Sequence, residues 1–190
     1  MIKKIIFSFF ILFHTSVFAE DILTVGTYDS FAADWGPGPN IEDGFEKICN
    51  CDLQFIATSQ AGSLSSDIFV KGKDVILGVE HNDFDTSYND NLWAFYDYGY
   101  FAFIYDNSKL NNPPKSMDDL INRNDLKIVV QDPRTSPVGM GLLRWMKSIF
   151  GDEYQYKMSK LNKNIVTYTP GWTEAYGMFL GGNADIVLSY

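Results

Sequence analysis

The chain has 190 residues, and its 24 acidic against 15 basic side chains give a formal charge of -9 at neutral pH. This acidity, with no run of lysine and arginine able to neutralise successive phosphates, argues against a nucleic-acid-binding protein. The two cysteines and two histidines give no spacing typical of a four-ligand zinc site.

The first 19 residues have the three parts of a secretory signal peptide. Lys3 and Lys4 form the basic start, residues 5–13 the apolar core, and residues 17–19 a small-residue cleavage site. The apolar run is shorter than the roughly 20 residues that cross a bilayer, so a membrane anchor is the weaker interpretation. Removal of the 19 residues, two of them lysines, leaves 171 residues with a formal charge of -11. We expect an exported, soluble, periplasmic protein.

The remaining sequence alternates apolar strand-like runs with helix-like segments, a pattern typical of βαβ units and a mainly parallel sheet. Strands are expected over residues 22–27, 53–58, 75–79, 100–105, 127–131 and 186–190. Helices are expected after Asn40, Ser116 and Ser136, whose side chains suit the N-cap position, and over residues 174–180. The pattern predicts an α/β fold.

The loop after the first expected strand combines aromatic rings with carboxylates. Tyr28, Asp29, Asp34 and Trp35 all lie in it, ahead of a Gly-Pro-Gly-Pro run that ends regular structure. Loops at the carboxyl ends of strands line the ligand site of open α/β sheets, and the faces of Tyr and Trp attract cations. The residues alone leave two interpretations open: an organic-cation site, or a surface loop whose aromatic rings are packed inside.

A second loop, over residues 132–136, joins an expected strand to an expected helix. Ser136 suits the N-cap and Pro137 the first helical position, so backbone N–H groups and the positive end of the helix dipole lie here. Arg134, Thr135 and Ser136 are therefore candidates for holding an anionic or hydroxyl group. The alternative is ordinary helix capping. Trp172 and Tyr190 lie at the ends of later elements and are expected near the same side of the sheet.

Five blocks of the sequence, residues 27–39, 97–106, 131–136, 171–177 and 185–190, stand in an order that resembles the thiamine-binding periplasmic proteins. These proteins are the substrate receptors of bacterial thiamine ABC importers, and the resemblance covers nearly the whole chain. It implies a two-lobed periplasmic-binding-protein fold of type II. It also implies a signal peptide over residues 1–19, a first lobe over residues 20–98 and a second over residues 99–190.

The resemblance assigns roles to the candidate residues. Trp172 and Tyr190 match positions that line the thiamine pocket, while Tyr28 and Trp35 close it from the first lobe. Thr135, Ser136 and Arg134 would hold the hydroxyethyl end of thiamine or the phosphate of its ester. Asp29 or Asp34 would supply charge, or accept hydrogen bonds from the aminopyrimidine ring.

Cys49 and Cys51 stand where the family has a cysteine doublet. Export would let a disulfide between them persist, and the resemblance favours a local structural clip over a redox centre or a metal site. A bridge between residues two apart closes a very small loop, so it removes little entropy from the unfolded chain.

The chain also departs from the family. Family members continue well beyond the strand that ends here at Tyr190, the passage over residues 80–91 is shorter, and the acidic pocket residue near Gln60 is absent. We expect a truncated protein whose first lobe lacks its C-terminal part. Such a lobe would expose a sheet edge and apolar surface, and loss of function through the truncation is one of the two outcomes we expect.

The resulting functional hypothesis is a monomeric receptor that captures thiamine, or a thiamine phosphate, for import by an ABC permease. It would have no cofactor, no metal and no catalytic residue. One alternative is an iron(III) receptor, since related receptors hold iron through paired tyrosines and Tyr190 is suitably placed. Another is an exported thiamine-degrading enzyme, which needs a cysteine nucleophile; Cys49 and Cys51 match the structural doublet instead. His81 is the single histidine after residue 19, and we expect it in a surface loop.

Overall fold

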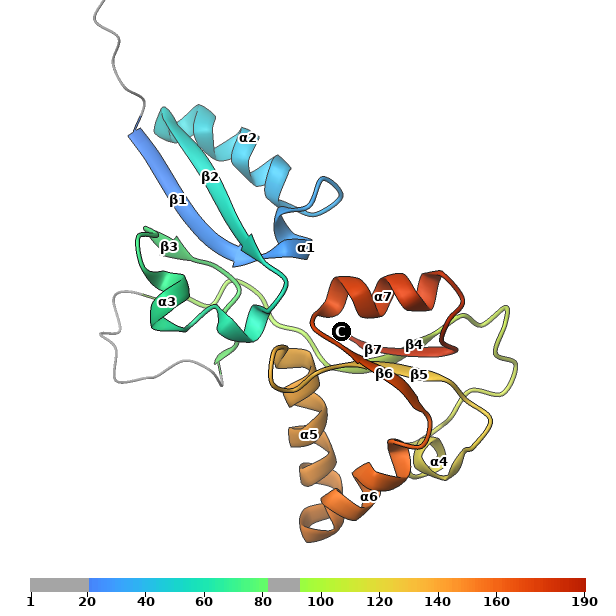
Figure 1. Cartoon of the computed structure of the whole chain (residues 1–190). Helices are drawn as coiled ribbons and strands as arrows, with labels where there is room; N and C mark the ends of the chain where they lie inside the picture. Colours follow the sequence, from blue (N-terminus) through green and yellow to red (C-terminus); the bar gives the residue numbers. More distant parts are fainter. Residues whose placement is uncertain (1–20, 82–92) are drawn as a thin grey trace, which may run out of the picture.

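The computed structural model describes residues 21–81 and 93–190, and their elements form two α/β lobes (Figure 1). The expected signal peptide lies outside these residues. The first lobe contains β1 (Asp21–Tyr28), α1 (Asp29–Ala32), α2 (Gly38–Cys49), β2 (Cys51–Thr58), a 3-10 turn (Ala61–Ser63), α3 (Asp67–Val70) and β3 (Val75–Ile76).

The second lobe begins at β4 (Ala102–Tyr105), after an extended connection over residues 93–101. It continues with α4 (Met117–Asn122), β5 (Ile128–Gln131), α5 (Pro137–Phe150), a 3-10 turn (Gly151–Glu153), α6 (Tyr154–Leu161), β6 (Ile165–Thr169), α7 (Trp172–Leu180) and β7 (Ile186–Ser189). Each of the two lobes expected from the sequence therefore contains one sheet.

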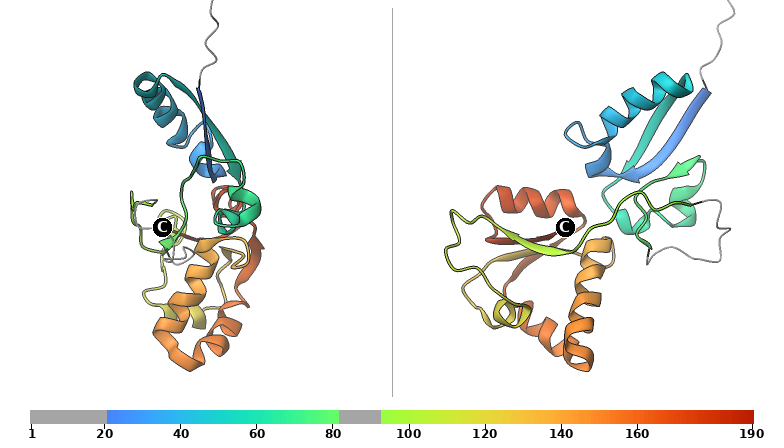
Figure 2. Two further views of the ribbon diagram at one scale, coloured as in Figure 1. Left: turned by 90° about the vertical axis from the view of Figure 1, so that its left-hand side faces the viewer. Right: turned by 180° about the vertical axis from the view of Figure 1, so that it is seen from behind.

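Both sheets are mainly parallel, as the alternation of elements predicted. In the first lobe the strand order is β2-β1-β3, with β1 parallel to both neighbours. In the second lobe the order is β4-β7-β5-β6, and only β4 runs antiparallel to its neighbour. The carboxyl ends of β1, β2, β5 and β7 point toward the region where the lobes meet, which Figure 2 shows from two further sides.

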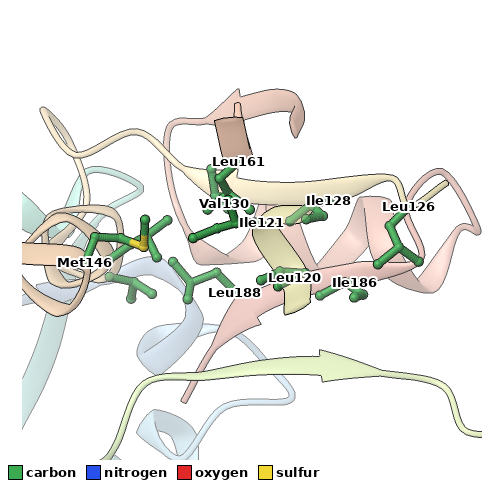
Figure 3. Close-up of a cluster of buried hydrophobic side chains, with 11 residues drawn as sticks. Leu120, Ile121, Leu126, Ile128, Val130, Met146, Leu161, Ile186 and Leu188 are labelled. Carbon is green, nitrogen blue, oxygen red and sulfur yellow. The ribbon is translucent and has the colours of Figure 1, made fainter. Parts of the chain in front are cut away.

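The core of the second lobe consists of two apolar layers on either side of its sheet. On one side β5 and β7 pack against α4, α5 and α6, through residues such as Ile128, Leu142 and Met146 that are at most 2% exposed (Figure 3). On the other side Val129 and Val187 pack under α7. Because strand residues alternate between the two faces, β5 and β7 are apolar on both.

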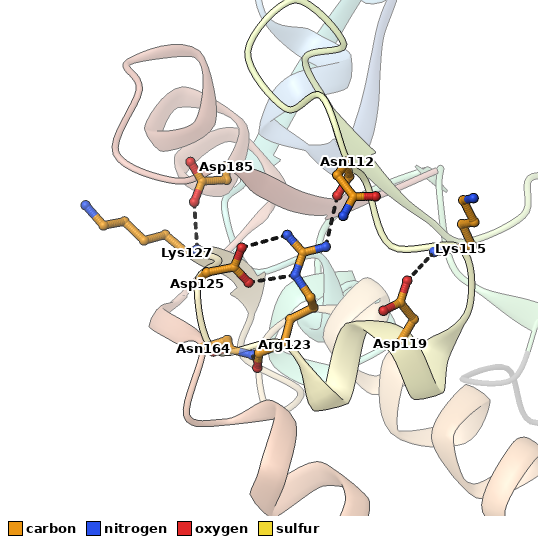
Figure 4. A network of polar contacts seen from close by, with 8 residues as sticks. All are labelled: Asn112, Lys115, Asp119, Arg123, Asp125, Lys127, Asn164 and Asp185. Atoms are coloured by element: carbon orange, nitrogen blue, oxygen red, sulfur yellow. Dashed lines mark hydrogen bonds and ion pairs between the residues drawn. The ribbon is translucent and has the colours of Figure 1, made fainter.

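A polar network holds the loops of the second lobe at the end opposite the first lobe (Figure 4). Arg123 pairs with Asp125 through two hydrogen bonds and also donates to the Asn112 carbonyl oxygen at 2.9 Å. The Lys127 backbone N–H donates to Asp185 at 2.8 Å, which ties the start of β5 to the start of β7.

The first lobe has a much smaller core. Val25, Phe31, Leu53 and Leu64 are buried, whereas many apolar side chains of this lobe stay exposed. Ile48 on α2 is 84% exposed and Ile68 is 91% exposed. The apolar surface expected from an incomplete lobe is therefore present, and β3, with two residues, forms one sheet edge.

Several sequence expectations were wrong in detail. The helix expected after Asn40 begins at Gly38, because Pro39 presets a helical backbone in its first turn. The strand expected over residues 75–79 ends at Ile76, and two residues later Gly78 takes a φ of 91°, which is not a strand conformation. Strand β6 was missed. Ser116 does cap its helix, since its hydroxyl oxygen accepts the Asp119 N–H at 3.1 Å.

A disulfide joins Cys49 and Cys51, whose Cα atoms lie 5.2 Å apart at the turn between α2 and β2. We predict that unreduced protein resists alkylation at both cysteines. Because the closed loop is so short, replacing both with serine should lower the free energy of unfolding by about 2 kcal/mol or less, measured by chemical denaturation. Alkylation of both thiols without reductant would contradict the bridge.

Gly139 lets α5 approach β5 closely. A Cβ there would overlap the Gln131 carbonyl oxygen and lie 2.8 Å from the carbonyl carbon of Asp132, and both neighbours are backbone. We predict that Gly139→Ala destabilises the protein by about 1–3 kcal/mol in urea unfolding, because the helix must shift.

Gly177 in α7 is the matched control, since a Cβ there meets nothing within 4 Å. Gly177→Ala should be neutral or stabilising by up to about 1 kcal/mol, because alanine favours a helix. Equal effects at the two glycines would contradict this account of the α5 to β5 contact.

Candidate functional site

The two lobes touch through residues that follow the carboxyl ends of their strands. The Gly62 N–H of the first lobe donates to the Thr135 carbonyl oxygen of the second at 3.0 Å. The Tyr190 hydroxyl, in the second lobe, donates to Glu80 Oε1 at 2.8 Å. We call this region, with the side chains around it, the lobe junction.

Two tryptophans, one from each lobe, are in contact at the lobe junction, with their ring planes tilted by 39°. The rings of Trp35 and Trp172 lie 6.1 Å apart between centroids, and Trp35 is 63% exposed. Trp172 is held firmly, since it stacks on Tyr176 at 4.6 Å and its indole N–H donates to the Ser189 hydroxyl at 2.8 Å. Neighbouring side chains therefore hold the Trp172 ring in place, whereas the Trp35 ring beside it is more exposed.

Tyr190 packs at a ring distance of 5.4 Å from Phe101, beside the connection between the lobes. Burial, followed by the charge of Glu80, raises the pKa of the Tyr190 hydroxyl. A tyrosine hydroxyl is protonated at neutral pH, so Tyr190 acts here as a hydrogen-bond donor.

Tyr28 reaches the lobe junction from the end of β1. Its ring lies directly over Gly78, where a side chain would collide with it. Burial raises the pKa of Tyr28, a side-chain hydrogen bond with Tyr96 lowers it, and the charges of Asp97 and Glu80 raise it further.

Asp29 and Asp34, the carboxylates expected to contact the ligand, show no contact with the two tryptophans among the described residues. Asp29 Oδ1 accepts the Ser30 N–H at 2.8 Å in the first turn of α1. Asp34 is exposed, and the described residues give it no ion pair. Of the predicted site residues, the structure brings Trp35 and Trp172 into ring contact and places Tyr190 directly after Ser189, which accepts the Trp172 hydrogen bond. Tyr28 packs over Gly78 instead.

Arg134, Thr135 and Ser136 lie at the start of α5, as predicted, but their side chains are already occupied or buried. Arg134 pairs with Asp132, its Nε lying 2.9 Å from Oδ1, and its side chain is 86% exposed. The Thr135 hydroxyl donates to the Pro170 carbonyl oxygen at 2.7 Å. Ser136 occupies the N-cap position, yet its hydroxyl caps no N–H group. Of the anion site expected here, the backbone N–H groups at the start of α5 are the part that these side-chain contacts leave open as a prediction.

Sequence reasoning missed three junction residues: Glu80, Tyr96 and Asp97. Glu80 follows the expected third strand, and Asp97 opens one of the five matching blocks, so both signals were visible. Three buried polar atoms near α7 also have no hydrogen-bond partner among the described residues: Gln131 Oε1, Thr173 Oγ1 and Glu174 Oε2.

Two cavities of about 290 Å³ each lie within the second lobe. One is lined by Asp132, Arg134, Leu142 and Tyr168, and the other by Phe103, Lys115 and Trp145 among others. In residues 21–81 and 93–190, no three acidic, histidine or cysteine side chains converge as metal ligands. The helices of that same part are too short or too polar to span a bilayer.

Comparison with solved structures defines the class of protein. A structure entitled periplasmic thiamin binding protein superposes with a TM-score of 0.80 at 43% identity, over 90% of this chain and 62% of that one. A second, entitled periplasmic binding protein P5PA, has a TM-score of 0.68 at 18% identity over 90% of this chain and 64% of that one, which supports the fold alone. The chain thus has the type II periplasmic-binding-protein fold.

Sequence comparison narrows this class. No protein-family model matches the chain. The thiamine-binding periplasmic protein of Escherichia coli (strain K12) is 42% identical over 216 aligned residues, which include all of this chain and 66% of that protein. The Haemophilus influenzae protein of the same name is 36% identical, over 94% of this chain and 63% of its own length.

By sequence, the chain belongs to the family of thiamine-binding periplasmic proteins. It spans slightly less than two thirds of the length of these relatives. The relatives are binding proteins by name, which agrees with a binding protein here.

The Asp132 to Arg134 pair gives a testable pH dependence. Hydrogen bonds from Arg134 hold the pKa of Asp132 at about 2, below the ordinary value of about 4. A depressed folded-state pKa adds stability above pH 4, and this contribution is lost as pH falls from about 4 to about 2.

We predict that Asp132→Asn is less stable than the unmodified protein at pH 6, and that the difference shrinks toward pH 2. Chemical denaturation across this range measures both free energies of unfolding. A difference independent of pH would show that the charge of Asp132 contributes nothing.

Proposed function

We propose that the protein is a periplasmic receptor that binds thiamine at the lobe junction for delivery to an ABC permease. The observation that carries the proposal is the contact between two indole rings, Trp35 and Trp172, one from each lobe. Thiamine contains a thiazolium ring with a permanent positive charge, and a desolvated aromatic face contributes about 2 kcal/mol to holding such a cation.

Binding would draw the lobes together. Trp172 is braced by Tyr176 and Ser189, so it needs little ordering when the ligand arrives, whereas the exposed Trp35 can adjust to it. Closure about the connection at residues 93–101 would bury the ligand between the lobes without bond chemistry. The receptor would act as a monomer without a cofactor.

The far end of the ligand would meet the start of α5. The N–H groups there, with Thr135 and Ser136, suit a hydroxyl or a phosphate, so both thiamine and its phosphate ester are candidate ligands. Arg134 would contribute little, because Asp132 already neutralises its guanidinium.

The two alternative functions have weaker support. Tyr190 and Glu80 are a phenol and a carboxylate in contact, which suits iron(III), but the relatives named above carry the thiamine name. A thiamine-degrading enzyme needs a cysteine nucleophile, and both cysteines of the sequence are joined in a disulfide.

Isothermal titration of residues 20–190 with thiamine tests the proposal. Trp172→Leu keeps an apolar side chain but removes the indole face, so we expect about 30-fold weaker binding, which corresponds to about 2 kcal/mol. Tyr156→Leu, at an exposed aromatic residue of α6, is the control and should bind like the unmodified chain. A folded chain that releases no heat with thiamine, or equal effects of both variants, would contradict the proposal.

A further inference from the structure

Two oxygen atoms, one from each lobe, meet at the start of α7. A Cβ added to Gly171, the residue before α7, would overlap the carbonyl oxygen of Ser59, which follows β2 in the first lobe (Figure 1). The same Cβ would lie 3.1 Å from Glu174 Oε2, in the first turn of α7. Both oxygens therefore border Gly171. They are close enough for one amino nitrogen to donate to both, since each such hydrogen bond spans about 2.9 Å.

The Glu174 carboxylate lacks a donor. Its Oε2 is buried and has no hydrogen-bond partner within residues 21–81 and 93–190. The Ser59 carbonyl oxygen beside it is a second acceptor, and neither a carbonyl oxygen nor an ionised carboxylate can donate a hydrogen bond. Buried polar atoms are nearly always hydrogen-bonded, so an acceptor shut off from water in this way points to a donor that arrives from outside the chain.

Two further unpartnered atoms lie under the same turn of α7. Gln131 is fully buried, and its amide nitrogen donates to the Leu188 carbonyl oxygen at 2.9 Å, but its Oε1 has no partner in the described part of the chain. Strand alternation puts Gln131 on the same face of the sheet as Val129, which packs under α7. Thr173 Oγ1 is also buried and unpartnered, and no side chain caps the start of α7. The turn therefore suits a polar group of a ligand.

This turn adjoins the aromatic contact between the lobes. Trp172 directly follows Gly171, and its ring contacts Trp35. In the first lobe, Ser59 directly follows Thr58, which pairs with Tyr28 in the register of β1 and β2. A ligand held by the two indole rings would therefore have the Glu174 and Ser59 oxygens within reach of its other end.

Lobe closure has an electrostatic consequence here. It brings a carboxylate oxygen of the second lobe against a carbonyl oxygen of the first, and two such negative atoms oppose closure when no hydrogen lies between them. A ligand N–H group would convert this unfavourable contact into two hydrogen bonds. The contact would thus favour closure around ligands that carry such a group.

We infer that Glu174 and the Ser59 carbonyl oxygen receive an amino group of the ligand, and that Glu174 selects ligands that carry one. The inference rests on the proposed function and deepens it, because thiamine carries an amino group on its pyrimidine ring. Glu174 takes the role that the sequence assigned to Asp29 or Asp34.

The test compares thiamine with oxythiamine, in which an oxygen replaces the amino nitrogen of the pyrimidine ring. Both ligands carry the thiazolium ring, so they make the same contact with the tryptophans. Residues 20–190 are titrated by calorimetry as the unmodified chain and as Glu174→Gln, Glu174→Ala and Glu153→Gln. Glu153 is an exposed glutamate of the same lobe, in the turn before α6, and serves as the matched control.

We expect the unmodified chain and Glu153→Gln to bind thiamine at least tenfold more tightly than oxythiamine. In Glu174→Gln this preference should fall below threefold, because the glutamine amide can itself donate to the Ser59 carbonyl oxygen and no longer needs the ligand amino group. Glu174→Ala should lose the preference as well. Circular dichroism and thermal unfolding establish that each variant is folded, and either Glu174 variant suffices if the other is not.

The failures are distinguishable. If the unmodified chain binds thiamine but has no preference over oxythiamine, or if the Glu174 variants keep the preference, the proposed function stands and this inference is overturned. Loss of both ligands in every folded Glu174 variant would assign Glu174 a structural role and would also overturn it. If the folded, unmodified chain binds neither ligand, the proposed function and the inference both fail.

Discussion

Burial of β5 and β7 on both faces is the constraint on which the rest of the structure depends. Apolar side chains cover one face under α4, α5 and α6 and the other under α7. Helices cover both faces of the sheet, and β5 and β7 run parallel as neighbours. Their carboxyl ends therefore lie at the same end of the sheet, and the residues that follow them lie near one another. Thr135 follows β5 and Tyr190 follows β7, while Trp172 is anchored to Ser189 within β7. The position of the aromatic side chains is thus a consequence of packing some distance beneath them.

The first lobe depends on the second more than the reverse. Its buried apolar residues are few, and several large apolar side chains remain in contact with water. A lobe with so small a core gains little free energy from apolar burial. Hydrogen bonds to the second lobe, such as Tyr190 to Glu80 and Gly62 to Thr135, therefore contribute a larger share of its stability. Ligand held between Trp35 and Trp172 would add to the same contacts and stabilise the lobe by mass action.

The sequence predicted the class of fold and most strands because these features follow from short-range patterns. Apolar runs identified β1, β2, β5 and β7, and the capping residue Ser116 located α4. It could not predict the partners of charged side chains. Asp132 and Arg134 are two residues apart, yet their pairing, which occupies Arg134, depends on the conformation of the turn.

Glu80 and Tyr190 are far apart in sequence and meet only because two sheets face each other. The edge strand β6, whose sequence Ile-Val-Thr-Tyr-Thr is rich in strand-favouring residues, was overlooked although a local pattern marks it. The exposure of the apolar face of α2 depends on the rest of the lobe, which local patterns do not describe. The assignment of residues to lobes and to ligand contacts therefore rested on family resemblance, and remains a prediction that binding experiments can test.

The most direct test of the central claim is a two-dimensional NMR titration of residues 20–190 with thiamine. The account predicts that the backbone amide signals of Gly62, Thr135, Trp172 and Ser189 shift, because these residues surround the lobe junction. Signals near the second-lobe cavity at Lys115 and Trp145 should stay in place. Shifts confined to that cavity, or a folded spectrum that thiamine leaves unchanged, would contradict a ligand site between the lobes.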